Sequence, residues 1–363
     1  MSVHAPAVDE AELVLRSAFP EHEEPTRRRP SWIRRTLVGL GALAVVLAMV
    51  VGGGLWFLTD RYAGNIERVG DVFAALQDSS RPAAPTAAPT ATAVPITFLL
   101  VGSDTRAEIA AGELPDARSD AIMLARFAGD REHVQVISIP RDSWVDIPGH
   151  GSNKINAAYA LGGPSLLVQT VEQLTGVRID HYAAIDFAGL TEVTDDLGGV
   201  DVVVPTTTSN GPYTFTAGLN HLDGDQARWY VGQRYGLPGG DFDRVKRQQN
   251  YLRATFTKLF SQDVFTSPGR LDATMLSVTG AVAVDDGLSD TDLLSMAYSL
   301  RGLTPSDVQF FTAPVLGTGR EGSASVVYLD RTTGERMWSY LGNDSLGQNA
   351  AEFADEALPA VTN

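Results

Sequence analysis

Residues 96–103 read ITFLLVGS, an apolar run of strand length that ends at a glycine and predicts a buried β-strand. Two further runs, DAIMLARF (120–127) and HVQVISIP (133–140), have the same character, and Gly129–Asp130 between them predicts a turn. Helix-like and strand-like segments alternate along the chain that follows. This alternation is typical of an α/β domain in which helices cover both faces of a sheet.

Glycines mark the ends of the next two predicted helices. KINAAYAL (154–161) has a helical pattern and stops at Gly162–Gly163, and SLLVQTVEQLT (165–175) is followed by Gly176 in a C-cap position. The remaining predicted elements are strands at 181–187, 200–204, 276–284 and 308–315, and helices at 188–197 and 290–301.

The longest predicted helix spans residues 242–260, with Asp241 as its N-cap. Its apolar positions keep a heptad-like spacing and are expected to face the core; they are Phe242, Val245, Leu252, Phe256 and Leu259. A single domain over residues 96–345 accounts for all of these elements, followed by a C-terminal tail at 346–363.

The composition excludes several classes of function. The chain has no cysteine, so disulfides, Cys-ligated zinc, iron–sulfur clusters and thiol nucleophiles are all excluded. The formal net charge is -16, and because six arginines and six acidic residues balance in residues 1–36, the whole acidic excess follows position 59. An acidic domain is a poor partner for nucleic acid, where neutralisation of phosphates dominates affinity.

An uncharged run of 22 residues at 37–58 predicts one transmembrane helix. As a helix it would be roughly 33 Å long, about the thickness of the apolar layer of a bilayer. Because Arg27, Arg28, Arg29, Arg34 and Arg35 precede it, the positive-inside rule predicts a cytoplasmic N-terminus and an extracellular C-terminal domain. The alternative is a cleaved signal peptide, for which the run is long and distant from Met1.

Segments of low complexity flank this predicted membrane span. Residues 1–36 are rich in proline and charge and predict a disordered cytoplasmic tail. Residues 59–95 predict an extracellular stalk, with a short amphipathic helix at 60–78 and then SSRPAAPTAAPTATAVP (79–95) as a semi-rigid extended spacer.

Polar residues gather where the first three predicted strands begin or end, which is where α/β domains bind ligands. GSDTR follows the first strand, RSD opens the second and SIPRD closes the third, so Asp104, Asp120 and Arg141 are expected to converge at one edge of the sheet. Two carboxylates without a nearby histidine or cysteine suit a hard cation such as Mg²⁺. Alternatively, these carboxylates cap turns or pair with Arg106 and Arg118.

The long helix carries a second polar group. Arg244, Arg247 and Gln248 have i, i+3, i+4 spacing and share one arc of the helix, and Arg234 lies just upstream. One guanidinium group can bind two phosphate oxygens at once, so this cluster suits a pyrophosphate. The alternative is a solvated basic helix face.

Taken together, five segments resemble the LytR–CpsA–Psr (LCP) family. They occur in the family's order and are LLVGSDTR, ARSDAIMLARF, VISIPRDSWVDIPGHGSNKINAAYALGG, HYAAIDFAGL with DLGGVDV, and YVGQRYGLPGGDFDRVKRQQ. The resemblance implies a three-layer α/β/α domain with a mixed central sheet and a long hydrophobic pocket for a polyprenyl chain. It also implies a membrane-anchored enzyme that transfers a phosphoglycan, such as teichoic acid or arabinogalactan, from a polyprenyl-pyrophosphate carrier to peptidoglycan and releases polyprenyl phosphate.

The resemblance also assigns roles to individual residues. Asp104 and Asp120 would hold Mg²⁺, and with Arg141 they would form the catalytic group. The pyrophosphate would be contacted or positioned by Arg106, Arg118, Arg234, Arg244, Arg247, Gln248, Lys154 and Asn156. The chain departs from the family pattern at Gly232, where an arginine is usual; either Lys246 or Arg228 compensates, or the chain is a weakened or specialised member.

Three other functions compete with the transferase. A non-catalytic scaffold would bind the polyprenyl lipid without needing the carboxylates. A pyrophosphatase would use the same site with water as the acceptor. A transcriptional regulator is disfavoured, because the sequence lacks a basic DNA-reading surface and the predicted topology places the domain outside the cytoplasm.

Overall fold

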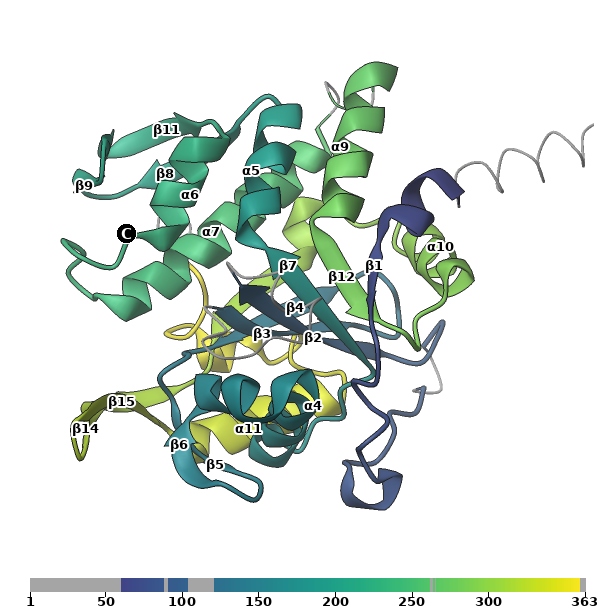
Figure 1. Cartoon of the computed structure of the whole chain (residues 1–363), viewed down its shortest axis with the longest axis vertical. Helices are drawn as coiled ribbons and strands as arrows, with labels where there is room; N and C mark the ends of the chain where they lie inside the picture. The colour runs from purple at the N-terminus through teal and green to yellow at the C-terminus, as the bar shows by residue number, and fades with distance from the viewer. Residues whose placement is uncertain (1–59, 88–90, 104–120, 262–263, 265, 360–363) are drawn as a thin grey trace, which may run out of the picture. The chain divides into compact units, whose positions relative to one another are not determined.

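The computed structural model describes residues 60–87, 91–103, 121–261, 264 and 266–359 (Figure 1). Within these ranges no helix is both long and apolar enough to cross a membrane. The predicted cytoplasmic tail and the predicted span at 37–58 lie outside the described residues.

A seven-stranded sheet forms the centre of the described domain, and it is mixed, as the family resemblance implies. β2–β3 and β3–β4 are antiparallel pairs, whereas β2–β7 and β4–β13 are parallel. The strands, in their order across the sheet, are β1 (Glu67–Val69), β12 (Val282–Asp285), β7 (His181–Asp186), β2 (Ile96–Ser103), β3 (Ala121–Phe127), β4 (Val134–Ile139) and β13 (Val308–Thr312).

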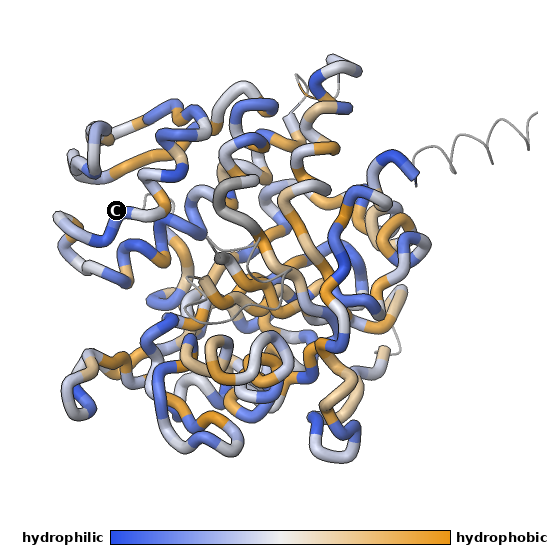
Figure 2. Tube along the Cα trace, viewed as in Figure 1, coloured by the Kyte–Doolittle hydropathy of each residue, from blue (hydrophilic) through white to orange (hydrophobic). Residues whose placement is uncertain are grey.

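Helices cover both faces of this sheet, giving three layers (Figure 1). Side chains alternate along a strand, so Leu99 and Val101 pack toward α4 (Ile155–Thr175) and α11 (Arg331–Gly342). Phe98 and its neighbours pack on the opposite face, against α10 (Asp290–Ser299) and α7 (Asp241–Leu259). The central strands are correspondingly apolar in Figure 2.

Helix α4 joins the two helices predicted at 154–161 and 165–175 across a kink. Gly162 and Gly163 have non-helical backbone angles and Pro164 follows them, so the predicted break is confirmed. The helix ends at Gly176, whose φ of 66° lies in the left-handed region that a residue without Cβ adopts at low cost.

A second group of elements packs beside the sheet around its own apolar cluster. The strand predicted at 200–204 belongs here, because it pairs with β11 rather than with the central sheet. The elements of this group are α5 (Phe187–Asp196), β8 (Val200–Val204), β9 (Thr208–Asn210), β10 (Tyr213–Phe215), β11 (Gly218–Leu222), α6 (Gly224–Gly232), α7 and α9 (Pro268–Gly280).

Two expectations about the later elements need correction. Residues 276–280 belong to helix α9, so the strand predicted at 276–284 is confined to β12. The apolar stripe of α7 is only partly its buried face, since Val245 is buried whereas Phe242 and Phe256 stay half-exposed. The other buried residues of α7 are mostly polar, and include Asp243, Arg244, Arg247, Gln248, Gln249 and Asn250.

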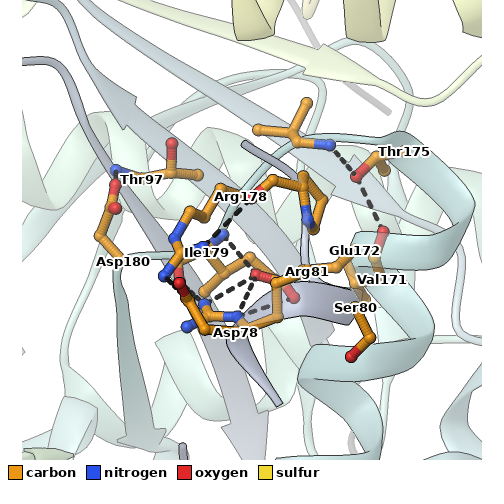
Figure 3. Close-up of polar contacts among 12 residues, drawn as sticks. Asp78, Ser80, Arg81, Thr97, Val171, Glu172, Thr175, Arg178, Ile179 and Asp180 are labelled. Carbon is orange, nitrogen blue, oxygen red and sulfur yellow. Dashed lines mark hydrogen bonds and ion pairs between the residues drawn. The ribbon is translucent and has the colours of Figure 1, made fainter. Parts of the chain in front are cut away.

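The predicted stalk takes part in the folded domain. Residues 67–69 form edge strand β1, which pairs with β12, where an amphipathic helix was expected at 60–78. Further along, Arg81 forms a bidentate ion pair with Glu172 of α4 and also donates to the carbonyl of Ile179 (Figure 3). Glu172 is 3% exposed, so this buried carboxylate fixes the segment to the domain.

The C-terminal residues also pack on the domain. Phe353, in the short helix η4 (Ala350–Phe353), is buried in the core cluster that contains α4 and α11. Ala357 forms a β-bridge with Phe311 of β13. The remaining elements are β5 (Trp144–Ile147), β6 (Gly151–Lys154), β14 (Val315–Glu321), β15 (Ala324–Leu329), η1 (Ala63–Asn65), η2 (Asp78–Ser80) and η3 (Pro305–Asp307).

Candidate functional site

A pocket of about 440 Å³ lies where the chain leaves β4 and enters α4. Its volume is within the usual range for small-molecule sites. Four of the residues predicted from the sequence line it together: Arg141, Lys154, Asn156 and Arg234. The other lining residues are Asp142, Asn153, Ala157, Ala160 and Leu161.

Backbone contacts fix the cationic wall of this pocket. The amide of Asn156, in the first turn of α4, donates to the carbonyl of Arg141 at 3.2 Å. The Nζ of Lys154 lies 3.1 Å from an oxygen of Asp142, so the two side chains hold each other at the pocket wall. The connection after β4 and the start of α4 therefore present Arg141 and Lys154 on the same side.

Asp241 links two of the predicted arginines. One of its carboxylate oxygens lies 2.9 Å from Arg244 and 3.5 Å from Nε of Arg234. Gly240 is the residue that precedes the helix, so Asp241 is the first residue of α7 rather than its N-cap. The N-cap role predicted for Asp241 is therefore wrong, and the fold shows instead that its carboxylate pairs with two arginines.

Arg247 lies away from the pocket lining, in a buried polar network. It is 0% exposed, donates to Gln233 at 2.6 Å and to Thr208 at 2.7 Å, and its guanidinium lies 4.5 Å from the ring centre of Tyr230. Burial lowers the pKa of this guanidinium, because the charged form loses hydration. The structure therefore places Arg247 away from the pocket that Arg141, Lys154 and Arg234 line.

Gln248 lies in a third environment. It lines a narrow apolar cavity of about 20 Å³ between the sheet and helices α5 and α7. The cavity is lined otherwise by Leu100, Gly102, Ala121, Met123, Ile185, Leu190, Val231, Tyr251 and Leu252. The three residues that share one arc of α7 thus lie in three environments. Arg244 pairs with Asp241, Arg247 lies in the buried polar network, and Gln248 lines the apolar cavity.

Asp104, Arg106, Arg118 and Asp120 lie outside the described residues. The strand ends on either side of them are described, and there Gly102 of β2 pairs with Ala121 of β3. Among the described residues, no group of three or more His, Cys, Asp or Glu side chains is placed to hold a metal ion.

A comparison with known protein families shows which family this chain belongs to. A model of the LytR_cpsA_psr family matches residues 72–341. The chain belongs to the LytR–CpsA–Psr family. The match begins at residue 72, inside the predicted stalk, which agrees with the packing of Arg81 on the domain.

Curated relatives of this LCP protein act in cell-wall synthesis according to their names. It is 32% identical over 277 residues to "Cell wall biosynthesis protein LcpA" of Corynebacterium glutamicum, a match that covers 64% of this chain and 53% of LcpA. It is 34% identical over 205 residues to the "Polyisoprenyl-teichoic acid--peptidoglycan teichoic acid transferase TagU" of Enterococcus faecalis, covering 56% of this chain and 66% of TagU. The matches therefore span between half and two thirds of these relatives.

Solved structures show the same fold. TagV of Bacillus subtilis aligns with a TM-score of 0.56 and 27% identity, over 69% of this chain and 97% of TagV. A structure described as "TagT bound to LI-WTA" aligns with a TM-score of 0.54 and 26% identity, over 69% of this chain and 90% of that one. The mixed sheet with flanking helices is therefore the LCP fold.

Proposed function

We propose that this LCP protein is a membrane-anchored, extracytoplasmic phosphotransferase. It moves a phosphoglycan from a polyprenyl-pyrophosphate carrier to peptidoglycan and releases polyprenyl phosphate. The observation that carries the proposal is the pocket that gathers Arg141, Lys154 and Arg234 in a chain with a net charge of -16. The names of TagU and LcpA support the same class of reaction.

The pocket has the charge that a pyrophosphate needs. Arg141, Lys154 and Arg234 line its wall, and Arg244 is joined to Arg234 through Asp241. A hydroxyl of the acceptor glycan attacks the phosphorus next to the sugar, and the bond from that phosphorus to the bridging oxygen breaks. Polyprenyl phosphate leaves with the bridging oxygen and its electron pair, and the proton of the hydroxyl passes through solvent to this leaving phosphate. Fixed cations lower the barrier because they stabilise the charge that develops on the leaving phosphate.

The polyprenyl chain has a candidate entry point in the apolar cavity beside Gln248. The present volume of about 20 Å³ is close to the space that one water molecule fills. A lipid tail would therefore have to separate α7 from the sheet, with the side chains of Leu100, Met123 and Leu252 as its apolar lining.

Mg²⁺ belongs to the proposal through Asp104 and Asp120. Carboxylate oxygens are the ligands that this hard cation prefers, and the cation would supply charge neutralisation at the pyrophosphate. The support comes from the described strand ends, where Gly102 and Ala121 are cross-strand partners. In sequence, Asp104 follows Gly102 by two positions and Asp120 directly precedes Ala121.

Replacing Asp120 with alanine is expected to abolish release of polyprenyl monophosphate while the fold persists. The assay uses the full chain in detergent with a polyprenyl-pyrophosphate oligosaccharide, a peptidoglycan acceptor and Mg²⁺, followed by mass spectrometry. Asp355→Ala, at an exposed position with the same change of charge, is the matched control. Normal release from Asp120→Ala, or full activity in a chelator, would reject the metal assignment.

The same assay separates the competing functions. Release that occurs equally without the acceptor, with free phosphoglycan as product, identifies a pyrophosphatase. Tight binding of the lipid without any release identifies a scaffold. Release that depends on the acceptor, with the phosphoglycan joined to it, supports the transferase.

Replacing Gly232 with arginine is expected to raise kcat/KM. A Cβ at this exposed end of α6 meets no atom within 4 Å, so the side chain can be added without strain. A charged hydrogen bond to phosphate stabilises by about 1.5–3 kcal/mol, which corresponds to tenfold or more. Gly269→Arg is the control, because it adds the same charge at another open position. An unchanged kcat/KM for Gly232→Arg would show that no phosphate comes within its reach.

A further inference from the structure

One aromatic residue that directly follows a lining residue of the cationic pocket is almost fully exposed. Tyr235 is 88% exposed and follows Arg234, which lines the pocket, in the loop between α6 and α7. Leu161 of α4 lines the same pocket and is 47% exposed. Isolated exposed apolar residues are common on proteins, so exposure alone does not identify a site.

The backbone of this loop is held firmly, which sets Tyr235 apart from an ordinary surface residue. The side-chain amide of Gln233 donates to the carbonyl of Tyr235 at 3.0 Å and to that of Ser209 at 3.1 Å. Gln233 is itself buried and accepts a hydrogen bond from Arg247. The buried network around Arg247 therefore fixes the position from which the tyrosine ring projects.

The far half of the loop is anchored as well. Leu237 is buried, and the amide of Gly239 donates to the buried carboxylate of Asp243 at 2.7 Å. Gly236 has a φ of 74°, a left-handed conformation that favours glycine at this turn. With anchors on both sides, the loop loses little conformational entropy when its exposed ring meets a ligand.

The chemistry of the surroundings indicates what the ring contacts. A ligand whose phosphates lie against Arg141 and Arg234 carries its next chemical group past Leu161, which lines the pocket, or toward the loop in which Tyr235 directly follows Arg234. A tyrosine ring offers a flat apolar face and a hydroxyl, which together match a sugar ring with its apolar face and its polar edge. The phenol also suits binding because it adds a large contact area with few rotatable bonds.

We propose that Tyr235 is a specificity-determining residue that stacks on a sugar ring of the glycan substrate. Gln233 and Arg247 are positioning residues that act on it through the loop backbone. The proposal rests on the transferase function above and adds the glycan contact to it. The sugar ring belongs either to the lipid-linked donor or to the peptidoglycan acceptor.

The test compares Tyr235→Ala and Tyr235→Phe in the full chain, with donor and acceptor concentrations varied separately. Tyr235→Ala is expected to raise the KM for one glycan about 5- to 10-fold, because a stacked ring is lost. The phenylalanine variant keeps the ring and should stay within about twofold of wild type, with kcat little changed in both. Tyr298→Ala, which removes a 69% exposed tyrosine from α10, is the matched control.

Each outcome has a defined meaning. A rise in the KM for the acceptor alone places the ring against peptidoglycan, and a rise for the donor alone places it against the lipid-linked glycan. Unchanged KM values for both, or a loss shared equally by Tyr298→Ala, would overturn the proposal while leaving the transferase function intact.

A binding measurement keeps the proposal testable if no transfer is observed. Isothermal titration of the full chain with a tetramer of N-acetylglucosamine should show weaker binding for Tyr235→Ala than for Tyr235→Phe. That result, in a protein without transferase activity, would reject the proposed function and retain the sugar contact. Equal affinities of wild type and Tyr235→Ala would reject the contact.

Discussion

Arg81→Ala is expected to lower the free energy of unfolding by about 3–5 kcal/mol, because it leaves the carboxylate of Glu172 buried without its counter-ion. Glu172 is 3% exposed, and Arg81 approaches both of its oxygens, at 2.8 Å and 3.1 Å. After the substitution, the amide of Ile179 remains as a hydrogen-bond donor to this carboxylate. One amide does not replace a bidentate guanidinium.

Equilibrium unfolding of the full chain in urea measures this loss. The double variant Arg81→Met with Glu172→Met should recover most of the stability, because removing both charges removes the desolvation penalty as well. Asp78→Asn is the exposed control: Asp78 pairs with Arg178 at the surface, so little change is expected. Equal stabilities of wild type and Arg81→Ala would show that the segment does not hold the domain together.

Further contacts attach the segment around Arg81 to the rest of the domain. Arg178 adds a hydrogen bond to the carbonyl of Pro82, and Ser165 donates to that of Val72, so the segment is attached at several points. Residues 60–87 therefore belong to the folded domain and do not act as a free spacer, in agreement with the family match from residue 72.

Arg141→Met is expected to reduce kcat about 10²- to 10³-fold, the usual cost of removing a fixed group that stabilises transition-state charge. Arg141 lies beyond the end of β4, lines the pocket, and accepts a backbone hydrogen bond from Asn156. That backbone contact does not depend on the side chain, so the loop should keep its conformation. The thermal transition should therefore match wild type within the error of the measurement.

The measurement is the rate of polyprenyl monophosphate release at saturating donor. Arg320→Met, an exposed arginine on the β14–β15 hairpin, controls for the loss of one positive charge. Arg141→Lys keeps the charge without the paired geometry and should be intermediate. A kcat for Arg141→Met equal to that of wild type would show that Arg141 has no catalytic role. Lys154 and Arg234 would then be the pocket cations that act on the phosphate.

Much of the fold was predictable because its signals are local. The apolar runs give β2, β3 and β4 within one residue of their observed ends, and the glycines at 162, 163 and 176 give the kink and the end of α4. Convergence of Arg141, Lys154 and Asn156 was also predictable, because they lie close in sequence around one strand end and one helix start. The prediction that the five apolar residues of α7 with heptad-like spacing face the core was weaker, since spacing shows which residues share a face and not what that face meets.

Residues that are near neighbours in sequence were enough to predict β2, β3, β4 and the kink of α4, and motifs in a fixed order were enough to indicate the family. Three contacts could be seen only in the folded chain: Arg247 donates to Gln233 beneath the loop, Asp241 pairs with both Arg234 and Arg244, and Arg81 pairs with Glu172. Packing brings these residues together. A buried guanidinium must be hydrogen-bonded or paired, so its partner is the acceptor that the fold places next to it. Helical spacing cannot specify that partner, because it lies on another element of the fold.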